Sequence, residues 1–220
     1  MKDTRISDGE STDDTRSVLI EAGRDLFVTK GFDGASVRAI TERARANLGA
    51  ITYHFGSKLE LYHAVLESEL GPLADRVVAA GAGNGPALER MTAIVGAYFR
   101  HLEEHPHLPR LMLQEIAAGK PPPPVVSQTL KRVMGTLARL QQEGIADGTV
   151  RPGHPILTAL SVVAQPIYMT LVSPLLKAFA GLDLEDETTR AAAVDHSLAF
   201  VRAGLSPTDD IDGTTVEKKR

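Results

Sequence analysis

Apolar residues recur at helical spacing along most of the chain, and no segment alternates apolar and polar residues as a half-buried strand does. The first predicted helix runs from about Thr15 to Lys30, with Asp13 or Asp14 as its cap and Gly31 at its end. Two short helices follow, and then a fourth helix that begins at the capping-box sequence Ser57-Lys58-Leu59-Glu60. The pattern therefore predicts an all-α fold.

Five further helices are predicted in the second part of the chain, interrupted by a stiff, extended proline run at residues 121–124. They are expected at about 86–104, 107–118, from the proline run to 144, at 155–180 and at 187–203. The helix at 155–180 is apolar on nearly all sides, so it must be buried all round. Because one small bundle cannot cover the last two helices, we expect a homodimer in which each copy covers the other's hairpin.

Composition divides the chain into four parts. Residues 1–14 and 207–220 lack apolar periodicity and are expected to be disordered tails. Residues 15–66 form one predicted helical domain and residues 67–206 a second one. The stretch between 66 and 85 contains Gly71-Pro72, which should bend or end a helix, and a run of small residues.

The net charge is −4, but the basic residues gather near the N-terminal end. Residues 16–58 contain seven basic side chains against four acidic ones, so a locally basic head precedes an acidic body. Cysteine is absent, which excludes disulfides and thiol chemistry and fits a reducing compartment. No segment approaches the roughly 18 apolar residues of a membrane span. The sequence thus predicts a cytoplasmic protein with no membrane partner.

The basic head contains two short amphipathic helices joined by a tight turn, at about residues 36–44 and 47–55. Ser36 and Asn47 are residue types that cap helix starts. Such a pair suits a helix-turn-helix, in which the second helix enters the major groove of DNA. Spacing alone does not separate this interpretation from that of two ordinary amphipathic helices.

The order of residues resembles the TetR family of bacterial transcriptional regulators over about residues 15–66. The resemblance rests on Gly31-Phe32, Ser36-Val37, Ile40, Tyr53-His54-Phe55 and Ser57-Lys58, and the stretch from Asn47 to Lys58 is most similar to the CecR-like subgroup. It implies an N-terminal three-helix helix-turn-helix domain and a C-terminal helical regulatory and dimerisation domain. It also implies these DNA-binding residues: Ser36, Arg38, Arg45, Asn47, Leu48, Ala50, Thr52, Tyr53, His54 and Lys58.

Within this set the resemblance assigns Tyr53 and Lys58 to phosphates, and Asn47, Leu48, Ala50 and Thr52 to base edges. Two positions depart from the family pattern. Arg45 stands where most members have the turn glycine, and Thr52 stands where many have tyrosine. If the turn requires a positive φ, arginine there costs about 1 kcal/mol, unless the side chain is recruited to a phosphate.

A cavity for an uncharged or weakly charged organic compound is predicted in the C-terminal domain, where adaptable methionines and helix-interrupting prolines suit such a site. Its expected residues are Tyr98, Met112, Glu115, Met134, Gln165 and Tyr168. Each of them is also compatible with plain core packing or, for Glu115, with a carboxylate that reaches solvent from a helix edge.

No metal site, cofactor or catalytic role is predicted. His101, His105 and His107 lie close together, but Pro106 breaks the spacing that would align them as metal ligands. The chain has no Gly-rich phosphate loop, nucleophile elbow or zinc-protease motif, so a helical enzyme with a coincidental motif is the least favoured interpretation.

The function predicted is a repressor that occupies a near-palindromic operator as a homodimer and leaves it when a small, largely apolar effector binds. An effector can act by changing the separation of the two recognition helices, which must reach successive major grooves about 34–36 Å apart. The alternative keeps the DNA-binding head and makes the C-terminal domain a protein-interaction module without an effector.

Overall fold

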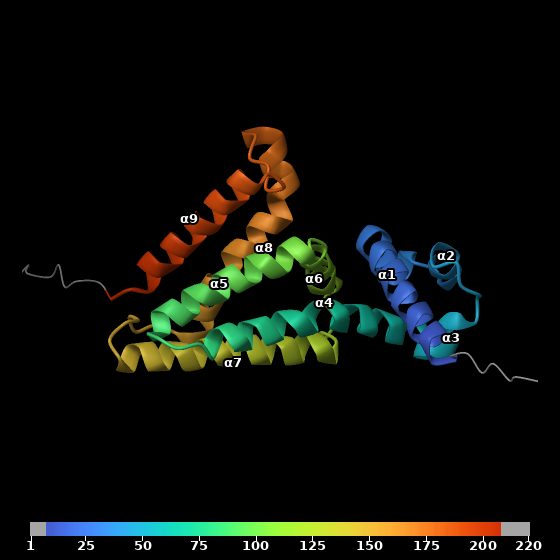
Figure 1. The fold of residues 1–220 in the computed structure, drawn as a ribbon, viewed down its shortest axis with the longest axis horizontal. Helices are drawn as coiled ribbons and strands as arrows, with labels where there is room; N and C mark the ends of the chain where they lie inside the picture. The colour runs from blue at the N-terminus through green and yellow to red at the C-terminus, as the bar shows by residue number, and fades with distance from the viewer. Residues whose placement is uncertain (1–7, 208–220) are drawn as a thin grey trace, which may run out of the picture. The chain divides into compact units, whose positions relative to one another are not determined.

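The structure, a computed structural model, describes residues 8–207, and within this range it contains nine helices (Figure 1). Their bounds are α1 Asp8–Gly34, α2 Val37–Arg43, α3 Ala50–Phe55, α4 Lys58–Gly81, α5 Ala87–Glu104, α6 Leu108–Ala118, α7 Pro124–Ala146, α8 Pro155–Ala180 and α9 Glu187–Leu205. No strand occurs between residues 8 and 207, so the predicted all-α fold class is confirmed.

Most helix starts and ends follow the sequence signals closely, but the starts of α1 and α3 and the end of α4 differ from them. The first helix begins at Asp8, seven residues before the predicted Thr15. The fourth helix passes through Pro72 and continues to Gly81, although Gly71-Pro72 was expected to bend or end it. Residues 1–7 and 208–220, which are half of the first predicted tail and all of the second except Pro207, lie outside the described residues.

The chain divides into two compact units. One contains the described residues up to Pro72 together with His107–Thr129, and the other contains Leu73–Pro106 and the described residues from Leu130 onward. The first unit therefore combines α1, α2, α3 and the start of α4 with α6 and the start of α7, which are distant in sequence. The division of the chain into domains at residues 66 and 67 remains a prediction.

The core of the first unit lies where α1 packs against α2 and α6, and α2 packs against α3. Leu19 and Phe27 of α1, Ile40 of α2 and Ile51 of α3 are almost completely buried there. Gly31 has a φ of 70° and interrupts α1, as its position in the sequence predicted. A left-handed φ suits glycine because it has no Cβ to clash with the neighbouring carbonyl.

In the second unit, α5 packs against both α8 and α9. Its buried face repeats every three or four residues and includes Met91, Ile94, Val95, Tyr98 and Leu102. Two glycines permit close approaches. A Cβ at Gly81 would lie 2.5 Å from Thr136 Cγ2, and a Cβ at Gly144 would lie 2.3 Å from Val150 Cγ2.

The predicted all-round burial of α8 is not found within one copy of the chain. The structure buries Ala159, Val162, Val163 and Pro166 and leaves several large apolar side chains exposed. Among the described residues α8 is the one helix long and apolar enough to cross a membrane, and 22% of that stretch is buried. The expectation that no segment approaches a membrane span was therefore wrong, because the mean hydropathy of α8 stays high although uncharged polar residues interrupt it.

Candidate nucleic-acid interface

Helix α2 is held in place at both ends. Ser36 caps it, because the Ala39 backbone N–H donates to Ser36 Oγ at 3.1 Å. At the other end Arg43 Nε donates to Asp25 Oδ2 of α1 at 3.0 Å. The cap predicted at Ser36 is therefore confirmed, and it engages the hydroxyl that had been assigned to DNA.

The turn after α2 has the hydrogen bonds of a Schellman motif. The Ala46 N–H donates to Thr41 O at 2.9 Å, and the Arg45 N–H donates to Glu42 O at 3.2 Å. Arg45 occupies the left-handed position with a φ of 53°, which makes it the sole non-glycine residue with a positive φ in the part of the chain that the structure describes. The strained arginine that the sequence predicted is present.

Helix α3 has one buried face and one exposed face. Ala50 and Ile51 point into the core, whereas Thr52 and Tyr53 are exposed, with Tyr53 at 78%. Asn47 and Leu48 are exposed just before the helix. The predicted base-edge role of Ala50 does not fit this geometry, because its side chain is 5% exposed.

The predicted cap at Asn47 is also not found. Gly49 precedes the helix, and no side chain accepts a hydrogen bond there. Instead, the backbone carbonyl of Asn47 accepts the Ala50 N–H at 3.0 Å. The Asn47 side chain is therefore not used in starting α3.

Lys58 is turned toward the protein. Its Nζ donates to Phe32 O at 2.9 Å and to Ala35 O at 3.1 Å, and it lies 4.3 Å from the centre of the Phe32 ring. Two of its three N–H donors thus tie the start of α4 to the segment between α1 and α2. The phosphate contact predicted for Lys58 depends on the one donor that remains.

A recess of about 720 Å³ lies beside α3, lined by α1 between Asp14 and Val18, by the Schellman turn and by α3 itself. Arg45, Asn47, Tyr53 and His54 contribute to it, and Arg45 has no ion pair among the described residues. Arg38, by contrast, forms an ion pair: its Nε lies 2.8 Å from Glu42 Oε1, although the Arg38 side chain is 81% exposed. The unpaired guanidinium of Arg45 therefore lies close to the exposed side chains of α3.

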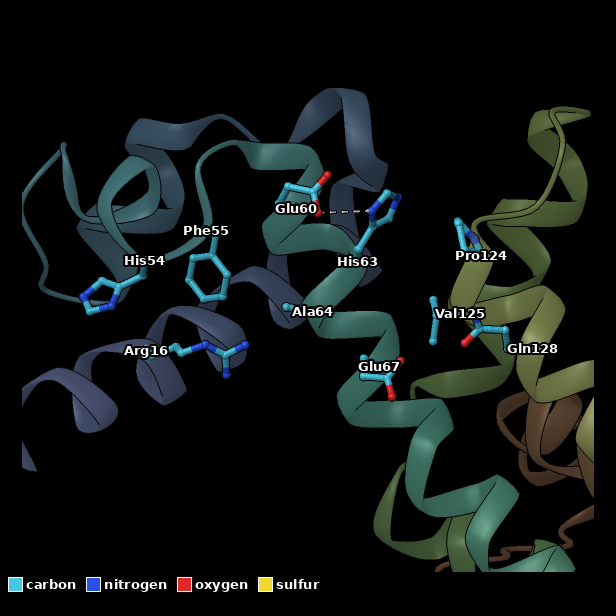
Figure 2. Close-up of a pocket in the computed structure, with 10 residues that line it drawn as sticks. All are labelled: Arg16, His54, Phe55, Glu60, His63, Ala64, Glu67, Pro124, Val125 and Gln128. Carbon is cyan, nitrogen blue, oxygen red and sulfur yellow. Dashed lines mark ion pairs between the residues drawn. The ribbon is translucent and has the colours of Figure 1, made fainter. Parts of the chain in front are cut away.

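A second recess, of about 460 Å³, is lined by α1, by the end of α3, by α4 and by the start of α7 (Figure 2). The Arg16 guanidinium lies over the Phe55 ring, 5.2 Å from its centre, which joins α1 to the end of α3. On α4, His63 faces Glu60 at 3.7 Å, as the dashed line in Figure 2 shows. Arg16 was counted in the basic head but not assigned a role, since no sequence signal pairs it with Phe55.

The predicted effector residues fall in both compact units. Tyr98 and Met134 are buried in the second unit, where Gln165 is half-buried and Tyr168 is 65% exposed. Met112 and Glu115 are on α6, in the unit that contains the helix-turn-helix. The structure therefore does not gather the six residues within one unit.

Glu115 has a specific partner in the first unit. The Tyr62 hydroxyl donates to Glu115 Oε1, and burial together with this bond raises the pKa of Tyr62. The adjacent Gln114 Nε2 donates to Val28 O of α1 at 3.1 Å. The position of the Glu115 carboxylate among apolar residues of α6 indicated that it could have a specific partner. The sequence did not show that this partner is Tyr62, which is 53 positions away.

Histidines 101 and 105 stack on each other, with ring centroids 4.2 Å apart, and His101 is fully buried. Among the described residues no group of three or more histidine, aspartate or glutamate side chains is arranged to hold a metal ion.

Two family models match the chain. Residues 19–65 match the model described as bacterial regulatory proteins, tetR family, and residues 88–201 match a tetracyclin repressor-like C-terminal domain. The chain belongs to the TetR family. The second match covers more than half of the 220 residues, and the first spans α2 and α3 together with the second half of α1 and the start of α4.

Several relatives of this TetR-family chain have been named for their activity. The HTH-type transcriptional activator FasR of Mycolicibacterium smegmatis is 31% identical over 109 residues, which are 50% of each chain. The repressor AcnR of Corynebacterium glutamicum is 31% identical over 33% of this chain and 38% of its own. These matches span half the length of the relatives or less. The repressor NicS of Pseudomonas putida is 26% identical over 83% of this chain and 88% of its own.

Solved structures share the fold. A fatty acid metabolism regulator described as putative, from Clostridium perfringens, superposes with a TM-score of 0.70 at 17% identity, covering 86% of this chain and 99% of that one. The ketosteroid regulator KstR2 of Mycobacterium tuberculosis has a TM-score of 0.68 at 21% identity, covering 87% and 95%. At these identities the likeness extends to the fold and not to the ligands.

Proposed function

We propose that this TetR-family chain binds a near-palindromic operator as a homodimer, represses transcription, and leaves the operator when a small, largely apolar effector binds. The observation that carries the DNA-binding part is the exposed face of α3 beside Arg45, which has no ion pair among the described residues. We favour repression over activation because two of the relatives described above, AcnR and NicS, are named repressors. Another of these relatives, FasR, is named an activator.

The proposed DNA contacts follow the exposed residues. Asn47, Leu48 and Thr52 read base edges, while Tyr53 and Arg45 hold phosphates. Ser36, Arg38, His54 and the remaining donor of Lys58 flank this face. In a dimer, two such faces have to reach major grooves about 34–36 Å apart.

Footprinting on DNA that flanks the chain's own gene tests this proposal. We expect a protected, near-palindromic site, and we expect Thr52→Ala to change which sequence is preferred. Tyr53→Phe should weaken binding to all sequences alike, because it removes a phosphate donor. Thr188→Ala, a matched exposed threonine on α9, should change neither property. Equal affinity for every sequence before and after Thr52→Ala would contradict the proposed reading face.

A second copy of the chain is the proposed cover for the exposed side of α8 and α9. Leu157, Leu160, Leu175 and Phe179 of α8, and Phe200 of α9, are 47–70% exposed. Asp195 and His196 are exposed on the same α9 helix, and lipid would penalise such polar groups. The observations therefore favour a protein interface over a bilayer, in a cytoplasmic protein.

The proposed effector site in the regulatory domain is supported by Gln165. Its Oε1 atom is buried and has no hydrogen-bond partner among the described residues, and it lies on α8, which packs against the helix of Tyr98. A buried acceptor without a partner is a costly arrangement that a ligand donor can relieve.

A thermal-shift screen of small organic compounds tests the effector part. A compound at about a hundred times its dissociation constant should stabilise the protein by about 2.7 kcal/mol, and an effector must also lower operator affinity. If no compound shifts the melting temperature, the alternative takes its place, in which the second unit is a protein-interaction module.

We further infer that the chain belongs to the CecR-like subgroup, on the stretch from Asn47 to Lys58, and that its role is regulatory and not catalytic. The named relatives support the second inference, because they are described as transcriptional regulators.

A further inference from the structure

Arg16, on α1, is a basic residue beside α3 that the proposed DNA contacts leave out. It is exposed, and its guanidinium lies over the Phe55 ring at the end of α3. Contact with the face of a ring is an attraction between the charge and the π electrons, and it takes up no N–H donor in a hydrogen bond. Within residues 8–207 no other group pairs with this guanidinium. Arg16 is therefore a cation that a ring holds in place and that can still bind an anion.

A row of rings connects Arg16 to the exposed face of α3. The Tyr53 ring meets the His54 ring edge-on, with centroids 4.9 Å apart, and the His54 ring lies 6.3 Å from the Phe55 ring. His54 lines both recesses beside α3. Thr15, the residue before Arg16, lines the same recess as Tyr53. Arg16 thus continues the surface that we propose to face DNA.

Two carboxylates line the recess that contains Arg16, and neither forms an ion pair with it among the described residues. Glu60 instead faces His63 of its own helix at 3.7 Å. Glu67 lies farther along α4, and Figure 2 shows it on the side of Gln128, away from the end of α3. The positive charge of Arg16 is therefore not neutralised by a carboxylate of the recess.

We propose that Arg16 binds a phosphate of the DNA backbone, beside the phosphate contact of Tyr53. A guanidinium suits this ligand, because its planar fork of donors matches two phosphate oxygens. The Phe55 ring restricts the side chain before DNA arrives, so less side-chain entropy is lost on binding. The proposal rests on the proposed function, since it needs DNA at the exposed face of α3. The contact adds affinity without selecting a sequence.

The salt dependence of operator binding tests this contact. Arg16→Met removes the charge and keeps a long side chain beside the Phe55 ring, to which a thioether is also attracted. We expect roughly tenfold weaker binding and a logarithmic salt slope that is flatter by about 0.9, the share of one phosphate contact. Arg16→Lys keeps the charge and should keep the parent slope. A parent slope in Arg16→Met would overturn the proposal.

Arg110→Met is the matched control. Arg110 is an exposed arginine of α6 in the same compact unit, and no ion pair of its side chain is found between residues 8 and 207. The substitution removes the same charge, so we expect the parent slope and affinity. Equal flattening in Arg16→Met and Arg110→Met would count against the proposal, because net charge and not a contact would then set the slope.

Urea unfolding separates a phosphate contact from a structural one. We expect Arg16→Met to keep the unfolding midpoint of the parent chain while its salt slope flattens. If Arg16 only joins α1 to the end of α3, the midpoint should fall and the salt slope should stay unchanged. That result would replace the phosphate contact with a purely structural role.

A random duplex of the operator's length distinguishes this inference from the proposed function. Equal affinity of the parent chain for both duplexes overturns the proposed sequence-specific repressor. The slopes of Arg16→Met and Arg110→Met on the random duplex then still decide the role of Arg16. A preference for the operator together with a parent slope in Arg16→Met overturns this inference alone, and a chain that binds neither duplex overturns both.

Discussion

Arg45 occupies a backbone position that favours glycine. Left-handed φ brings a Cβ close to the following carbonyl oxygen, which costs roughly 1–2 kcal/mol for an ordinary residue. The Schellman hydrogen bonds of the turn require this conformation, so the strain persists in the folded state. The Arg45 guanidinium lies beside the exposed face of α3, and we propose that it binds a DNA phosphate there.

We therefore expect Arg45→Gly to raise the free energy of unfolding by about 1 kcal/mol while weakening operator binding. The salt dependence of binding should also flatten by about 0.9 in the logarithmic slope, the share of one phosphate contact. Urea unfolding and anisotropy at several salt concentrations measure the two effects. Ala46→Gly is the matched control, since Ala46 has no positive φ and should lose stability. A stability loss in Arg45→Gly would contradict the account of strain.

Lys58 illustrates a charged side chain whose position in the motif suggested one role and whose contacts indicate another. Its ammonium donates hydrogen bonds to two backbone carbonyls near the break in α1. We therefore expect Lys58→Met to lower the free energy of unfolding by about 1–3 kcal/mol. Lys30→Met, at an exposed lysine of the same unit, should stay within about 0.5 kcal/mol. An unchanged unfolding energy together with a flatter salt dependence of operator binding would restore Lys58 to a purely phosphate-binding role.

At the scale of elements, ion pairs connect α5 to three other helices of the second unit. Glu89 pairs with Arg202 of α9, Arg90 with Glu143 of α7, and Glu104 with Arg76 of α4. Hydrogen bonds from these arginines lower the pKa of Glu89, Glu143 and Glu104 below the ordinary value of 4.5. The carboxylates are largely at the surface, so the pairs are screened by solvent and serve mainly to fix which helices meet.

The sign of the pH effect follows from these lowered pKa values. A carboxyl that holds its proton less tightly in the folded chain contributes stability above its unfolded pKa, and the contribution is lost as pH falls through the folded pKa. We expect the unfolding free energy to decrease between about pH 6 and pH 3, and to decrease less in Arg202→Gln, which frees Glu89. Arg100→Gln, at another exposed arginine of α5, should keep the parent slope. Denaturant midpoints across this range give the measurement, and identical slopes in all three chains would contradict the argument.

At the scale of the whole molecule, the exposed apolar surface of α8 and α9 requires a partner. We expect Phe200→Arg to convert a dimer into a folded monomer, because its side chain is 61% exposed in one copy and would carry an unpaired charge into a dry interface. Leu198 is a weaker test, since it is already half-buried within one copy. Ile116→Arg, at a 77% exposed residue of α6, should leave the dimer intact. Sedimentation in detergent-free buffer measures both, and a monomeric parent chain would end the dimer proposal.

The sequence by itself determined the elements and the family. Some features could be predicted from the sequence because each depends on neighbours within about five residues. They are the helical periodicity, the Ser36 cap, the break at Gly31 and the glycine-type turn at position 45. The residues from Gly31 to Lys58 likewise carried the resemblance to the TetR family, which the family models confirm. Local signals sufficed where the interaction itself is local.

Only the tertiary structure decided what the side chains contact. Ala50 is buried, and Lys58 binds the backbone carbonyls of Phe32 and Ala35, because of how the neighbouring segments pack, and neither fact is encoded in the spacing of α3 or α4. Glu115 was predicted to share a site with Met134, yet its partner is Tyr62, and Met134 belongs to the other compact unit. Such contacts join residues dozens of positions apart, and they depend on how whole helices pack, which a periodic pattern along one helix does not specify.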